Sequence, residues 1–138
     1  MKNIFIFSSD GFPTLNNPNL GIFSFDQAKA IKDKKVYLFD LSTNFSNRII
    51  IDKYHGLKIY RLYSSKFNIF KIILNYLFIF KIVKKNRPSL ILSSFLNIKN
   101  IIYTSVLNSK KIVLIHGSDA NTKSFIRKFI FKFYLNKL

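Results

Sequence analysis

The stretch LIHGSDAN, residues 114–121, places polar residues directly after an apolar run in a chain otherwise dominated by Ile, Phe, Leu, Lys and Asn. If the run is a strand, His116 follows it at the carboxyl end of the sheet, and Gly117 permits a sharp exit of the backbone. An imidazole there can donate a hydrogen bond to a hydroxyl or phosphate, or titrate near neutral pH. In the alternative interpretation, a residue of SDAN caps a following helix and His116 only packs.

A second candidate, Gly21, ends the loop DGFPTLNNPNLG (10–21) directly before an expected helix. A glycine there would let a ligand approach the backbone at a helix N-terminus, where free N–H groups and the helix dipole favour anions. The alternative is a glycine required only by a long turn. The loop has neither G-x-G-x-x-G nor a Walker lysine, which argues against a dinucleotide or P-loop site.

The sequence lacks the motifs of other common catalytic sites. It has no cysteine, no glutamate, no G-x-S-x-G and no H-E-x-x-H, so neither a metal site nor a serine triad is predicted. The second histidine, His55, falls in an irregular connection and is expected at the surface.

Apolar runs and helical patterns alternate along the chain, as in βαβ units with a parallel sheet covered on both faces. The stretch NRIIIDKYHG is either an edge strand of the sheet or an excursion of the chain, that is, a connecting segment outside the sheet. We therefore expect an α/β fold, a Rossmann-like open parallel sheet of about five strands in the order 3-2-1-4-5, with Gly21 and His116 at one carboxyl edge. The expected strands are 3–9, 35–42, 57–64, 89–95 and 110–117, and the expected helices are 22–34, with Ile22, Phe25, Ala28 and Ile31 inward, 67–85, 97–108 and 122–138.

Composition limits the class of protein. The 138 residues suit one core, and 49% hydrophobic residues exclude a disordered chain. A net charge of +17 favours polyanionic partners: nucleic acid, phosphosugars or an anionic membrane. A coding sequence rich in A and T would raise the lysine content without any such ligand. No aromatic RNP or KH pattern is present, so no specific nucleic-acid partner is predicted.

Several segments together resemble the N-terminal domain of family 4 glycosyltransferases, which are GT-B enzymes of bacterial surface polysaccharide and lipopolysaccharide synthesis. These segments are IFIFSSD-x-FP, NLGIF, DQAKAI, GLKIYRL and IVLIHGSDAN, in this order. The resemblance spans essentially the whole chain. It implies that residues 1–138 are a single, incomplete acceptor-side domain, half of a GT-B fold.

The resemblance also implies roles for individual residues. His116 corresponds to the catalytic histidine of the cleft, and Gly21, Gly117, Ser118 and Asp119 to positions that bind substrate. The implied reaction is retaining transfer of a sugar from a nucleotide-sugar to a saccharide acceptor, without metal or other cofactor. The family's donor-binding domain carries a Glu-x₇-Glu motif, which cannot occur in a chain without glutamate. The chain alone is therefore expected to be inactive and to need a C-terminal domain in trans.

The alternative function is a non-catalytic basic module that binds an anionic membrane surface or nucleic acid. The apolar stretch 67–83 is short for a membrane span and contains Lys71 and Lys81. No secretory signal is evident after Met1. We expect a cytoplasmic protein with a peripheral contact at the inner membrane. The expected helix at 122–138, with lysines beside aromatic residues, suits such an interface, or else packs on the rest of the enzyme.

Overall fold

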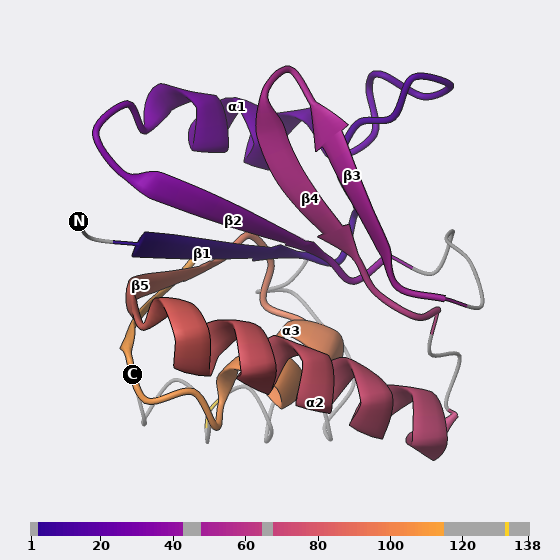
Figure 1. The fold of residues 1–138 in the computed structure, drawn as a ribbon, viewed down its shortest axis with the longest axis vertical. Coiled ribbons are helices and arrows are strands. Elements are labelled where there is room, and N and C mark those ends of the chain that lie inside the picture. Colours follow the sequence, from indigo (N-terminus) through magenta and orange to yellow (C-terminus); the bar gives the residue numbers. More distant parts are fainter. Residues whose placement is uncertain (1–2, 43–47, 65–67, 115–131, 133–138) are drawn as a thin grey trace.

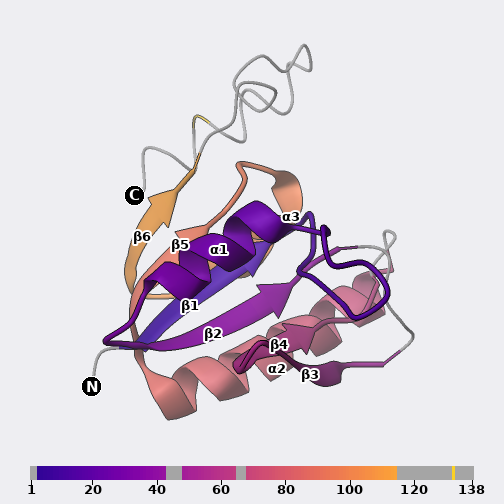
Figure 2. The same ribbon diagram turned by 90° about the horizontal axis from the view of Figure 1, so that it is seen from above.

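The computed structural model describes residues 3–42, 48–64, 68–114 and 132. These form one six-stranded sheet with the order β3-β4-β2-β1-β5-β6, visible in Figure 2. The elements are β1 (Asn3–Ser8), α1 (Ile22–Ala30), β2 (Lys35–Asp40), β3 (Ile50–Tyr54), β4 (Leu57–Arg61), α2 (Ile69–Asn86), β5 (Pro88–Ser93), α3 (Ile98–Thr104) and β6 (Lys110–Val113).

The sheet order confirms the prediction for the five parallel strands. β4, β2, β1, β5 and β6 lie side by side and parallel, in the predicted order 3-2-1-4-5. β3 pairs antiparallel with β4 and forms the edge, so NRIIIDKYHG contributes an edge strand. The β3–β4 hairpin turns through His55 and Gly56, which both have positive φ, and His55 is exposed as expected.

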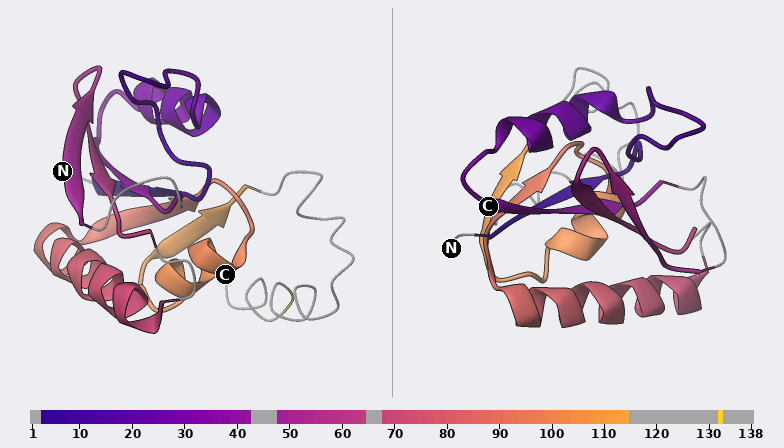
Figure 3. Two further views of the ribbon diagram at one scale, coloured as in Figure 1. Left: turned by 90° about the vertical axis from the view of Figure 1, so that its right-hand side faces the viewer. Right: turned by 45° about the horizontal axis from the view of Figure 1, so that its top comes forward.

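Helices cover both faces of the sheet: α1 lies on one side, and α2 and α3 lie on the other (Figures 1 and 3). A hydrophobic core lies on each face of the sheet, and β1 contributes side chains to both, because successive side chains of a strand point to opposite faces. Ile4 and Ile6 pack with Phe25 of α1. Phe5 and Phe7 belong to the other core, which includes Ile79 of α2.

The inward face of α1 differs from the prediction. Phe25 and Ala28 are buried as expected, but Ile22 is 43% exposed and Ser24 is buried in its place. The helix ends at Ala30, so Ile31 follows it in an extended conformation. A helix of nine residues can bury little more than one turn against the sheet. In α1 the buried residues are Ser24, Phe25 and Ala28.

The other helices lie near their predicted positions. α2 begins after Asn68, whose side chain accepts a hydrogen bond from the Lys71 amide, and it ends before Arg87 and Pro88. α3 is shorter than predicted and begins after Asn97, which caps it in the same way. Among the helices described, none is both long and apolar enough to cross a bilayer. The helix expected at 122–138 lies outside the described residues except for Lys132.

Candidate functional site

The carboxyl edge of the sheet holds a topological switch point between β1 and β5. From β1 the chain adds β2 and then β4 on one side, whereas β5 and β6 lie on the other side. In open α/β sheets, ligands bind outside the carboxyl ends of the strands at such a reversal. The segments that leave β1 and β5 at this edge are the loop 10–21 and residues 94–97.

These two segments are joined directly. The Asn97 side-chain amide donates a hydrogen bond to the Ser9 hydroxyl, which in turn donates to Asp10. On the β5 side, Asn100 donates to the Phe95 carbonyl oxygen at 2.7 Å. The switch point is therefore lined with amide and hydroxyl groups.

The loop 10–21 closes on itself through two glycines. Gly11 has a φ of 86° and Gly21 a φ of 57°, the left-handed region that favours glycine. A β-carbon added at Gly21 would lie 2.1 Å from the Gly11 carbonyl oxygen. Glycine is thus required at position 21 by the contact within the loop, whatever the loop binds.

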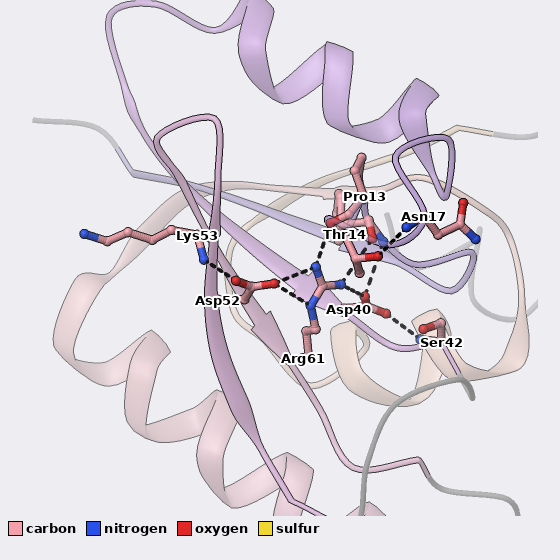
Figure 4. A network of polar contacts seen from close by, with 9 residues as sticks. Pro13, Thr14, Asn17, Asp40, Ser42, Asp52, Lys53 and Arg61 are labelled. Carbon is pink, nitrogen blue, oxygen red and sulfur yellow. Dashed lines mark hydrogen bonds and ion pairs between the residues drawn. The ribbon is translucent and has the colours of Figure 1, made fainter.

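Arg61, the last residue of β4, fastens this loop to the sheet (Figure 4). Its side chain is only 2% exposed and donates to the carbonyl oxygens of Phe12, at 3.1 Å, and Pro13, at 2.6 Å. It also forms ion pairs with Asp40, at 2.7 Å, and Asp52, at 3.0 Å. The five N–H donors of the guanidinium make five hydrogen bonds, because Asp52 accepts two of them and Asp40, Phe12 and Pro13 accept one each.

Asp40 is as fully engaged as its partner. One carboxylate oxygen accepts from Arg61 and from the Phe12 amide at 3.3 Å, and the other accepts from the Ser42 amide at 2.9 Å. A buried carboxylate with these partners acts as a structural anchor and is not placed to serve as a general base. The Arg61–Asp40 pair was not predicted from the sequence, although both strand runs, KVYLFD and LKIYR, end in a charged residue.

A cation and two hydroxyls complete the edge. Lys99 Nζ of α3 donates to the Leu41 carbonyl oxygen at 3.2 Å. Burial lowers the pKa of Lys99, and the negative charge of Asp40 partly opposes this shift. The Ser8 and Ser42 hydroxyls are buried, and no described residue hydrogen-bonds to them. Buried hydroxyls of this kind are candidates for hydrogen bonds to a bound molecule.

The fold matches that of a solved structure. A sucrose-phosphate synthase from Thermosynechococcus elongatus, which is a glycosyltransferase, superimposes on 98% of this chain with a TM-score of 0.63 and 13% sequence identity. The chain has a glycosyltransferase-like, Rossmann-like fold. It spans 40% of the length of that synthase. No protein-family model matches the sequence, and no curated protein matches it either.

Of the predicted site residues, Gly21 falls within the part of the chain that the structure describes. Gly21 lies at the end of the loop that leaves β1, directly before α1. His116, Gly117, Ser118 and Asp119 lie outside the described residues, so their roles stay predictions. Strand β6 ends at the same carboxyl edge, where the Leu114 amide donates to the Ser93 carbonyl oxygen at 2.9 Å. Within the described ranges no three His, Asp or other ligand residues gather as a metal would require.

Proposed function

We propose that this chain is the acceptor-side domain of a glycosyltransferase of the GT-B type, related to family 4. The observation that carries the proposal is the match of 98% of the chain to 40% of a glycosyltransferase. The amide and hydroxyl groups of Asn97 and Ser9 at the switch point support it, because such groups suit the hydroxyls of a saccharide. The half-buried Lys99 adds a cation that suits a phosphate.

In the proposed reaction a sugar moves from a nucleotide-sugar to a saccharide acceptor, with retention and without a metal. The acceptor is a growing surface polysaccharide or lipopolysaccharide at the cytoplasmic face of the membrane. His116 lies beside the transferred sugar, with Gly117, Ser118 and Asp119 as its neighbours. The leaving diphosphate needs positive electrostatic potential, which basic side chains and a helix N-terminus supply. The N-terminus of α1, after Gly21, has no acidic residue in its first turn.

The donor site is assigned to a second domain, because this sequence contains no glutamate and so lacks the paired glutamates of the family's donor half. Closing two domains over both substrates aligns the acceptor oxygen, and positioning of this kind supplies roughly 7–11 kcal/mol of a barrier. The 138-residue chain by itself is therefore proposed to transfer no sugar.

The test is a transfer assay with radiolabelled nucleotide-sugars. The chain alone should give no product, and adding a matching C-terminal domain should restore turnover. In that reconstituted enzyme His116→Asn should lower turnover about 100-fold, the loss typical when a hydrogen-bond donor to the transition state is removed or misplaced. The matched control is His55→Asn, the other histidine of the chain, which should leave turnover unchanged. Transfer by the chain alone, or equal effects of the two substitutions, would contradict the proposal.

A further inference from the structure

The outward face of α2 is apolar. Helical spacing of three and four residues brings its exposed side chains onto one side of the helix. These side chains are Ile69 (73% exposed), Phe70 (68%), Ile73 (49%), Leu77 (60%) and Phe80 (54%).

This face is not needed by the core. α2 meets the sheet through the opposite side, where Asn75 and Ile79 are buried and Ile72, Tyr76 and Val83 pack against the core. An apolar patch of this kind on a helix surface marks a contact with a partner or a membrane.

The charged residues of α2 itself are all lysines. Lys81 and Lys84 are exposed on the same side of the helix, and Lys85 and Arg87 follow at its end. None of the six aspartates of the chain falls between Ile69 and Arg87. A helix with large apolar residues beside lysines has the composition of helices that lie in the interface of an anionic bilayer.

We propose that the outward face of α2 docks this protein on an anionic membrane surface, with the helix parallel to the bilayer. Phe70, Leu77 and Phe80 enter the boundary between headgroups and acyl chains, and Lys81 and Lys84 contact lipid phosphates. A second copy of the chain fits the face less well, because pairing would bring two chains of charge +17 together through a helix that contains no acidic residue. The inference goes beyond the proposed transfer activity and does not depend on it.

Co-sedimentation with vesicles of phosphatidylcholine, with and without phosphatidylserine, tests the docking surface. The full chain should bind the vesicles that contain phosphatidylserine and bind the neutral ones weakly. Leu77→Gln should weaken binding roughly tenfold or more, since a buried leucine contributes about that factor. The matched control is Leu15→Gln in the loop 10–21, where Leu15 is 92% exposed. This control should bind as the unchanged chain does.

A second pair of variants tests the charges. Lys81→Gln with Lys84→Gln should weaken binding to anionic vesicles by about fivefold per lysine. Lys32→Gln with Lys34→Gln changes the net charge equally in the connection between α1 and β2, and should have a much smaller effect. Circular dichroism of each variant confirms that it is folded.

Three results would overturn the proposal. One is equal binding of the chain to neutral and anionic vesicles. Another is that a control weakens binding as much as its test variant does, either for the two leucine variants or for the two lysine double variants. The third is a dimer in sedimentation velocity that dissociates on Leu77→Gln while the chain binds no vesicle, which would assign the face to a second copy.

Discussion

Gly21 passes so close to Gly11 that a β-carbon on Gly21 would lie 2.1 Å from the Gly11 carbonyl oxygen. The neighbouring atoms are backbone and cannot rotate away. This contact holds the two ends of the loop 10–21 together at the switch point. The glycine that the sequence suggests as a ligand contact is first of all a requirement of the loop.

Gly21→Ala should therefore lower the free energy of unfolding by about 3 kcal/mol or more, from backbone strain together with steric clash. Gly56→Ala separates the two causes, because Gly56 also has a positive φ, of 81°, but a β-carbon there would meet nothing within 4 Å. The control should cost only about 1–2 kcal/mol. Urea denaturation measures the free energy of unfolding of both variants. Similar losses of stability in the two would show that the loop opens to accept the methyl group.

Arg61→Met should destabilise the protein by about 3–5 kcal/mol, because it leaves Asp40 as a buried charge without its partner. It should also expose the loop 10–21 to proteases, since the carbonyls of Phe12 and Pro13 lose their donor. Asp52→Asn is the control. The Asp52 side chain is 39% exposed, so its loss of charge should cost about 1 kcal/mol or less. Thermal melts and limited proteolysis measure the two effects, and an Asp52 effect as large as that of Arg61 would contradict this ranking.

Asn75→Ala should loosen α2 from the rest of the molecule. Its buried side chain accepts from the Tyr63 amide at 2.9 Å and donates to the Tyr63 carbonyl and the Tyr103 hydroxyl, each at 3.1 Å. Leaving such groups unpaired should cost about 3 kcal/mol in total. Tyr103→Phe removes only one of these bonds and should cost about 1 kcal/mol. Hydrogen exchange should show the Tyr63 amide losing protection in Asn75→Ala and keeping it in Tyr103→Phe.

Lys99 should make stability depend on pH in the alkaline range. Burial lowers its pKa in the folded protein, so just below the ordinary lysine pKa of about 10.4 the unfolded chain binds more protons than the folded one. The free energy of unfolding should therefore rise with pH in that window, relative to Lys99→Met, in which this contribution is absent. Denaturation of both proteins across the window measures the difference. A difference that falls with pH would show that the pKa of Lys99 is raised.

The order of the elements could be predicted from the sequence alone. Continuous apolar runs such as IFIF in β1 and LIL in β5 are typical of strands buried on both faces, and the helical patterns between them favour parallel pairing. Right-handed crossovers then leave few possible orders for the five parallel strands, and the predicted order was right. These features depend on local periodicity and chain connectivity, which the sequence contains directly.

Only the tertiary structure decided which side of each element is buried and which polar groups are paired. In α2, where nearly every side is apolar, periodicity could not show that Asn75 faces inward and Leu77 outward. Arg61 and Asp40 are 21 residues apart and meet because β2 and β4 are neighbours. The close approach of Gly21 to Gly11 likewise depends on how the whole loop closes. Such contacts join residues distant in sequence, and the burial that stabilises them exists only once the sheet and helices have packed.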